Sequence, residues 1–256
     1  MAGLDTTPLA STPLTADTVG LLEGLSTTRA IRRYTGDPIP DGTLRDILFA
    51  ATRAPSGSNR QPFRFLVLRD SETARAAKRL LGDAARRAWG SKRAHDGYDR
   101  GSGATADSPK ARMGASMEHY VANFEQAPVV VLALLQRYRE PTPTEGGSLY
   151  PACQNLLLAA RALGYGGVLT IFNALVDEEL HALLDIPADV FIAATITLGK
   201  PAGRHGPVRR RPLNELVSED TWQGTAAWAV DPPGTRFTSA GPPRDTQRSN
   251  PTTKDQ

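Results

Sequence analysis

Cysteine is almost absent from this chain of 256 residues, which contains only Cys153. A single cysteine cannot form an internal disulfide or supply a cysteine cluster for a metal ion. The four histidines, His95, His119, His181 and His205, lie far apart, and no two of them form the i,i+4 pair that holds zinc on a helix. The sequence therefore excludes a disulfide framework and argues against a zinc site.

Long apolar runs and an excess of one charge are also missing. No window has enough consecutive apolar residues for a membrane-spanning helix, and residues 1–20 lack the basic and then apolar pattern of a secretory signal. The chain has 30 basic and 27 acidic residues, a net charge of +3, which is too small to indicate a nucleic-acid-binding protein. These absences predict a soluble, cytoplasmic protein with neither a nucleic-acid nor a membrane partner.

Composition divides the chain into three parts. The first part, residues 1–18, is rich in Thr, Pro and Ala and is predicted to be a flexible leader. A folded domain is expected over residues 19–217, and residues 218–256 are expected to form a largely flexible extension. The extension contains Trp222 and Trp228, and two exposed indoles would be unusual on a monomer, so it is expected to dock on the core or on a partner subunit.

Helix and strand signals alternate within the folded part. They predict helices over 41–54, 72–89, 146–164 and 177–186, and strands over 63–68, 128–135 and 190–201. Asp41 is expected to cap the first helix, while Pro151 and Gly164 mark the first turn and the end of the third. The third helix is apolar nearly all round, which predicts burial in the core or in an oligomer interface. The fold class is therefore α/β or α+β.

Residues 90–119 fit neither a helix nor a strand pattern. This stretch is polar and Gly-rich, and loops of that length are usually lids, binding loops or disorder. It contains GSGATA, residues 101–106, which formally matches a dinucleotide-binding fingerprint. The match lacks the preceding strand and the following helix that this fingerprint requires, so a Rossmann crevice is not expected.

The stretch APSGSNRQPF, residues 54–63, concentrates small, hydroxyl and amide side chains directly before a strand. Ordinary turn chemistry is one explanation. The other is that backbone N–H groups and short side chains are presented to a planar, polar ligand.

Two arginine clusters suggest a phosphate. Arg29, Arg32 and Arg33 fall within residues 27–34, and three further arginines fill positions 209–211. Guanidinium groups bind phosphate oxygens through paired hydrogen bonds. Each cluster taken alone is better explained as a solvated basic surface, but together with residues 54–63 the two clusters fit a family.

Four stretches resemble the flavin-dependent nitroreductases. They are TTRAIRRYTGDPIP (27–40), AATRAPSGSNRQPFRFLVL (50–68), NLLLAARALGYGGVLTIF (155–172) and ITLGKP followed by VRRRPLNELV (196–201 and 208–217). Each stretch alone is a weak signal, whereas their order and spacing are specific. The resemblance runs from about residue 22 to 217.

The resemblance implies an α+β, nitroreductase-like fold with a central mixed sheet flanked by helices. It also implies an intertwined homodimer with one FMN at each of two sites between the subunits. In this sequence Arg29 and Arg32 are expected to hold the flavin phosphate, joined by Arg210 from the cluster at 209–211. The other residues expected along the flavin are Ala30, Ser56, Gly57, Ser58, Gln61, Leu169, Thr170 and Ile171, with Ser148 and Gln154 as weaker candidates.

The first motif departs from the family pattern. It often opens with two basic residues followed by Ser, whereas this chain has Thr28, Arg29 and Ala30. One phosphate ligand and one hydroxyl are therefore missing, and the additional arginines near position 210 are candidates to compensate.

The resemblance predicts an oxidoreductase with ping-pong kinetics. NAD(P)H reduces FMN by hydride transfer and leaves, and a nitroaromatic, quinone or activated alkene is then reduced in the same pocket. No acid–base side chain is singled out, because the chemistry takes place on N5 of FMN, and residues 90–124 are expected to select the acceptor as a lid. The alternatives are a flavin-binding or sequestering protein with little turnover, and a specialised member that oxidises or fragments a metabolite or its own flavin.

Overall fold

The computed structural model describes residues 18–238 of the chain. The chain divides into two compact units, Met1–Gly206 and Pro207–Gln256. The leader expected over residues 1–18 lies outside the described residues except for Thr18, and so does the part of the extension beyond residue 238.

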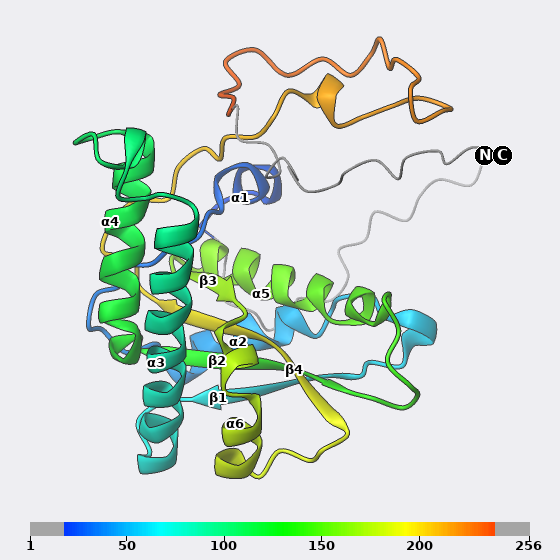
Figure 1. Ribbon diagram of the computed structural model, residues 1–256. Helices are drawn as coiled ribbons and strands as arrows, with labels where there is room; N and C mark the ends of the chain where they lie inside the picture. Colours follow the sequence, from blue (N-terminus) through cyan, green and yellow to red (C-terminus); the bar gives the residue numbers. More distant parts are fainter. Residues whose placement is uncertain (1–17, 239–256) are drawn as a thin grey trace, which may run out of the picture. The chain divides into compact units, whose positions relative to one another are not determined.

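The first unit is built on a four-stranded sheet, with strand order β1-β2-β4-β3 (Figure 1). Its strands are β1 (Phe63–Leu68), β2 (Val129–Gln136), β3 (Gly166–Thr170) and β4 (Val190–Gly199). All three pairings between these strands are antiparallel. The α+β class is as expected, whereas the sheet, predicted to be mixed, is antiparallel throughout the described part of one chain.

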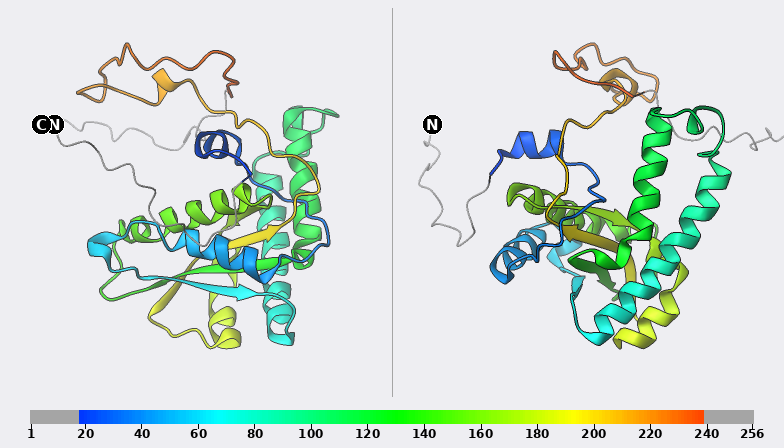
Figure 2. Two further views of the ribbon diagram at one scale, coloured as in Figure 1. Left: turned by 180° about the vertical axis from the view of Figure 1, so that it is seen from behind. Right: turned by 90° about the vertical axis from the view of Figure 1, so that its left-hand side faces the viewer.

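Helices cover both faces of the sheet (Figures 1 and 2). On one face lie α2 (Asp41–Ala51) and α5 (Tyr150–Ala162), and on the other lie α3 (Glu72–His95), α4 (Pro109–Ala122) and α6 (Asp177–Leu184). Strand β2 shows the consequence, because Val129 and Val131 pack with α2 and α5 whereas Val130 and Leu132 pack with α3 and α4. Because both faces of this strand are covered, nearly all of its side chains are apolar, which explains the continuous apolar run in the sequence.

The remaining helical elements are short. Helix α1 (Leu21–Thr27) precedes the first arginine cluster and contacts α5. The described residues also contain six short 3₁₀ segments: η1 (Gly57–Asn59), η2 (Gly101–Gly103), η3 (Phe124–Gln126), η4 (Glu145–Ser148), η5 (Phe172–Leu175) and η6 (Leu213–Glu215). No helix within residues 18–238 is long and apolar enough to span a membrane.

The ends of two helices test the sequence expectations. Pro151 lies in the first turn of α5, and Gly164, at φ +81°, follows its end, as expected. The expected cap at Asp41 is wrong, because Pro40 occupies the N-cap position and no side chain caps α2. The Asp41 carboxylate pairs with Arg69 instead, with 2.6 Å between its Oδ1 and Nη1.

The long loop expected over residues 90–119 is also wrong. Helix α3 continues without interruption to His95, and it forms a hairpin with α4 through residues 96–108 (Figure 2). Side-chain contacts hold the hairpin together: the ring centroids of Trp89 and Tyr98 lie 5.0 Å apart, and Trp89 Nε1 donates to Glu118 Oε2 at 2.7 Å. Ser108 begins α4, because its Oγ accepts from the Ala111 N–H at 2.9 Å.

The described part of the second unit, residues 207–238, contains η6 and little other regular structure. Its backbone bridges join Arg210 to Phe237 and Ser218 to Thr225. Trp222 and Trp228 are both exposed, at 88% and 64%. The docking of this extension on a core or a partner remains a prediction.

Candidate functional site

The loop between α2 and β1 has a strained backbone. Ser58, Asn59 and Gln61 have φ values of 51°, 51° and 50°, in the left-handed region. Each non-glycine residue held there costs roughly 1–3 kcal/mol and persists only where its surroundings fix it. Such strain concentrates at ligand-binding loops, so the loop is a site candidate on its conformation as well as its composition.

Hydrogen bonds to side chains help to fix this loop. The Gly57 N–H donates to Ser148 Oγ at 3.0 Å, which ties the loop to η4. Within the loop, the Gln61 N–H donates to Ser56 Oγ at 2.9 Å, and Gln61 Nε2 donates to Asn59 Oδ1 at 3.2 Å. The structure thus brings Ser148, a weaker candidate from the sequence, into contact with the second motif.

The first motif packs against the third. The Ile31 N–H donates to the Gly167 carbonyl of β3 at 3.0 Å, and Tyr34 bridges to Pro201 after β4. A Cβ added at Gly166 would lie 2.6 Å from Ile31 Cγ1, so glycine is required there for the two segments to meet. Residues far apart in sequence, from 28–34 and 166–170, therefore lie side by side.

Arg32 is the most unusual side chain in this region. Its buried Nε has no hydrogen-bond partner, and the guanidinium forms no ion pair within residues 18–238. Burial lowers the pKa of Arg32 from its ordinary value, although Tyr120, Tyr34 and Tyr98 oppose this shift. A half-buried cation with no ion-pair partner among the described residues is costly, so this position is suited to an anionic ligand.

The tyrosines beside Arg32 are not its counter-ions. Thr197 Oγ1 lies 2.8 Å from the Tyr34 hydroxyl and 3.0 Å from the Tyr120 hydroxyl. Burial raises the pKa of both phenols well above the usual value. Both groups therefore stay neutral at physiological pH and serve as hydrogen-bonding groups.

The rest of the first motif is more open. Ala30 and Arg29 are exposed, and Arg29 Nη2 donates to the Arg204 carbonyl at 2.8 Å. Thr28 Oγ1 is buried and has no hydrogen-bond partner among the described residues, and the same holds for Nδ1 of His205, a residue that the sequence did not single out. Nε2 of His205 lies 3.0 Å from the Tyr165 carbonyl oxygen, and burial lowers its pKa.

The other candidates are distributed as follows. Leu169 and Thr170 are half-buried on β3, where Thr170 Oγ1 donates to the Thr195 carbonyl at 3.2 Å, and Ile171 is 64% exposed just beyond the strand. Gln154 is exposed on α5. Arg210 belongs to the second unit, where its Nη1 donates to the Arg209 carbonyl at 2.9 Å. The role of each of these residues toward a flavin remains a prediction.

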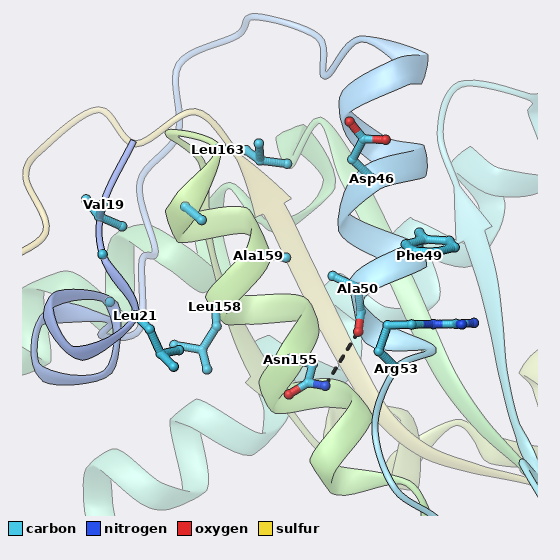
Figure 3. A pocket seen from close by; sticks show the side chains of 13 residues that line it. Val19, Leu21, Asp46, Phe49, Ala50, Arg53, Asn155, Leu158, Ala159 and Leu163 are labelled. Atoms are coloured by element: carbon cyan, nitrogen blue, oxygen red, sulfur yellow. Dashed lines mark hydrogen bonds between the residues drawn. The ribbon is translucent and has the colours of Figure 1, made fainter. Parts of the chain in front are cut away.

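An apolar groove of about 550 Å³ opens between α1, α2 and α5 (Figure 3). Leu21 of α1 and Leu158 of α5 point toward one another in it, and Asn155 Nδ2 donates to the Ala50 carbonyl at 3.5 Å. Helix α5 thus buries Ala152 and Leu156 in the core while Leu158 and Ala159 face the groove. The sequence predicts that this helix is apolar nearly all round, and the structure shows why: one side of α5 packs in the core and the other lines the groove.

Metal chemistry has no support in the described residues. Within residues 18–238, no three His, Cys, Asp or Glu side chains gather where they could hold a metal ion. Cys153 is buried among apolar residues of α5, and burial raises the pKa of its thiol to about 12. The thiol is therefore protonated at physiological pH and acts as a small apolar side chain.

Known proteins share both the sequence and the fold of this chain. An NADH dehydrogenase of Thermus thermophilus is 34% identical over 197 residues, which cover 74% of this chain and 90% of that protein. A Desulfovibrio desulfuricans protein, provisionally named a nitroreductase and solved in complex with FMN, is 30% identical with a TM-score of 0.56 over 78% of this chain and 96% of that one. Nitroreductase A of Vibrio parahaemolyticus shares the fold, with a TM-score of 0.58 at 21% identity over 80% of this chain and 77% of its own.

The sequence profile of the nitroreductase family matches residues 25–200. This range includes the first three motifs and all four strands of the sheet. The chain belongs to the nitroreductase family.

Proposed function

We propose that this chain transfers a hydride from NAD(P)H to a small organic oxidant in two separate half-reactions, with FMN as its resident cofactor. Membership of the nitroreductase family makes it an FMN-dependent oxidoreductase. The similar protein from Desulfovibrio desulfuricans was solved with FMN, and the similar Thermus thermophilus protein is named an NADH dehydrogenase. These names specify neither the order of the two half-reactions nor the kind of acceptor, and both are part of the proposal.

The observation that carries the proposal is the unpaired Arg32. Its buried Nε lacks a partner and its charge lacks a carboxylate within the described residues. FMN offers phosphate oxygens and carbonyl oxygens that can satisfy such a donor. The residues present therefore fit this cofactor, in a motif that family resemblance independently assigns to it.

The remaining residues supply shape and position. The strained loop at Ser58, Asn59 and Gln61 gives a fixed backbone surface that a planar ring can approach. Arg29 is proposed to hold the phosphate with Arg32, and Leu169, Thr170 and Ile171 to lie along the ring. When bound, FMN would supply two-electron redox chemistry, so the chain's own residues would bind and orient it, and no proton donor is assigned among them.

The acceptor is proposed to be a nitroaromatic, a quinone or an activated alkene. These compounds are flat and can stack on the face that a departing nicotinamide leaves free. The last residues of α3, from Gly90 to His95, and all of α4 fall within the range expected to form the lid, residues 90–124. The role of this range in selecting the acceptor stays a prediction, now for a pair of helices instead of a loop.

The homodimer is part of the proposal, and the apolar groove between α1, α2 and α5 supports it. Leu21 and Leu158 line it, with exposed Phe49 of α2 beside them, and an apolar surface of this kind is typical of obligate dimer interfaces. The variant Leu158→Glu should give a monomer in size-exclusion chromatography with light scattering. Thr73→Glu places the same charge on an exposed position of α3 and should leave the dimer intact.

An anaerobic absorbance titration tests the function. Protein reconstituted with FMN is titrated with NADPH and then with NADH, and rapid loss of the flavin bands is expected with at least one donor. Arg32→Gln should weaken FMN binding about 10-fold or more, as expected for loss of a charged hydrogen bond, whereas exposed Arg33→Gln should change it little.

Other outcomes overturn the proposal. Flavin bands that persist with both donors support the sequestering alternative. If mass spectrometry of the flavin after aerobic turnover finds it fragmented, the chain is a specialised, flavin-consuming enzyme. Failure to bind FMN removes the proposal entirely.

A further inference from the structure

Two arginines stack on one exposed tyrosine near the strained loop. The Cζ atom of Arg60 lies 4.7 Å from the centroid of the Tyr138 ring, and that of Arg139 lies 5.4 Å from the same centroid. Arg60 belongs to the second motif, whereas Tyr138 and Arg139 follow β2. The tyrosine is 53% exposed and both arginines are exposed, so this cluster is open to a ligand.

These two arginines are not engaged in ion pairs within residues 18–238, although Arg139 lies near the carboxylate of Glu145. The neighbouring carboxylate, Glu145, is held by Arg137, which donates from Nη2 to Oε1 at 2.7 Å and from Nε to Oε2 at 3.1 Å. Glu140 forms no ion pair within residues 18–238, and the same holds for Arg60 and Arg139. Two cations that are held together on one ring and form no ion pair favour an anion.

The cluster adjoins the loop assigned to the flavin. Residues 137–139 share a small hollow with Pro62 and Ser148. Ser148 is also the acceptor for the Gly57 N–H, so one side chain contacts both regions. A ligand that spans from the strained loop to Tyr138 would touch the flavin region at one end and the arginines at the other.

We propose that Arg60, Tyr138 and Arg139 bind the phosphate-bearing adenosine part of the nicotinamide nucleotide and make NADPH the preferred donor. NADPH differs from NADH by a 2′-phosphate on this adenosine, and a phosphate monoester is the group that a pair of guanidinium groups recognises. The Tyr138 face offers a stacking surface for adenine once an arginine turns toward the phosphate. The proposal rests on the proposed function, because it assigns the donor of that reaction.

Transient kinetics of the FMN-loaded protein test this site. The apparent dissociation constant of each donor is measured from anaerobic flavin reduction by stopped flow. For the double variant Arg60→Gln/Arg139→Gln, the NADPH constant should rise about 10- to 100-fold, the effect of losing hydrogen bonds between charged groups. The NADH constant should change less than about threefold, because only NADPH carries the extra phosphate. Arg79→Gln, at an exposed position of α3, is the matched control and should change neither constant.

Binding of 2′,5′-ADP separates this proposal from the proposed function. Isothermal titration calorimetry on the FMN-loaded protein needs no flavin reduction, so it tests the site even if neither donor reduces the flavin. The wild-type protein should bind 2′,5′-ADP more tightly than 5′-AMP, and the double variant should lose this difference. Equal binding of the two nucleotides by the wild-type protein would overturn the site.

Three other results would also overturn it. Equal weakening of NADPH and NADH would mean that the arginines do not recognise the 2′-phosphate. A lower FMN content in the double variant would mean that they hold the flavin phosphate. No change in any constant would mean that the cluster is only a solvated basic surface.

Discussion

Gly57 and Ser148 are joined by a hydrogen bond across 91 positions of the chain, with the Gly57 N–H donating to Ser148 Oγ at 3.0 Å. The bond connects the strained loop after α2 to the turn before α5. A Cβ at Gly57 would lie 3.4 Å from the same oxygen, so the loop approaches η4 closely. Positioning of the loop therefore depends on a residue outside it.

Replacement of Ser148 should loosen this loop and weaken FMN binding. Ser148→Ala removes the acceptor of one hydrogen bond, whose net worth is about 0.5–1.5 kcal/mol, so the FMN dissociation constant should rise about 2- to 10-fold. The fluorescence of released FMN measures this constant. Ser91→Ala, at an exposed position of α3, removes a hydroxyl that bonds only within its helix and should have no effect. Unchanged FMN affinity in Ser148→Ala would show that the loop holds its shape without η4.

The sequence anticipated the segments whose local pattern agrees with their final environment. Strands β1 and β2 were predicted from their apolar runs, and β2 is buried along nearly its whole length. The limits of α5 were marked by Pro151 and Gly164, because proline and glycine have fixed backbone preferences that do not depend on distant contacts. These features depend on local sequence, so they could be predicted from the sequence of this chain alone.

The helix predicted over residues 72–89 covers most of α3, whereas the end of α3 and all of α4 could not be anticipated in the same way. The stretch over residues 90–119 is polar and Gly-rich, which lowers its local helix propensity. The two helices of the hairpin are stabilised by contacts of Trp89 with Tyr98 and Glu118. Strand β3 was missed for a related reason, because Gly166 and Gly167 weaken a strand signal yet are needed where Ile31 and Thr197 approach.

In the candidate site, too, local sequence features could be predicted and features that depend on packing could not. Motifs predicted which stretches matter, and the contact between residues 28–34 and β3 agrees with that prediction. The left-handed conformations at Ser58, Asn59 and Gln61 could not be predicted from the sequence, because none of these positions is a glycine. The absence of a partner for Arg32 Nε is likewise a property of three-dimensional packing.

The hydroxyl of Tyr34 should contribute substantially to stability. It donates to the Ile31 carbonyl at 2.7 Å and lies 2.8 Å from Thr197 Oγ1. Tyr34→Phe leaves these buried groups without their partner, so the free energy of unfolding should fall by about 1–3 kcal/mol. Urea unfolding followed by circular dichroism measures it. Tyr150→Phe is the control, because that hydroxyl has only a long contact of 3.5 Å with the Ala193 carbonyl, and its effect should stay within about 0.5 kcal/mol.

Histidines 181 and 205 should give stability opposite dependences on pH. Both ring nitrogens of His181 lie 2.9 Å from carbonyl oxygens, of Asp177 and Val190, and only the imidazolium can donate to both. These bonds, led by that to Asp177, raise its pKa above 6.5. Its contribution to stability is therefore complete below pH 6.5 and is lost as the pH rises through the folded-state pKa.

The contribution of His205 to stability changes with pH in the opposite direction, because burial lowers the pKa of this residue below 6.5. Its contribution is present above pH 6.5 and is lost as the pH falls toward the folded-state pKa, since the unfolded chain takes up the proton first. Urea unfolding between about pH 5 and 8 should show His181→Gln costing most at low pH and His205→Gln costing most at high pH. Parallel profiles for the two variants would contradict both assignments.

Two glycines of α3 should respond oppositely to alanine. In a helix, Ala is favoured over Gly by about 0.8–1.0 kcal/mol, because the glycine backbone loses more freedom on folding. At Gly90 an added Cβ meets no atom within 4 Å, so Gly90→Ala should raise the free energy of unfolding by about that amount. At Gly82 the Cβ would overlap the carboxylate of Glu125, which Arg86 Nη2 holds through a bond of 2.7 Å to Oε1. Glu125 must therefore move and lose this pairing, and Gly82→Ala should be less stable than Gly90→Ala by about 1–3 kcal/mol. Urea unfolding of both variants measures the difference, and equal stabilisation by the two would mean that Glu125 swings away without cost.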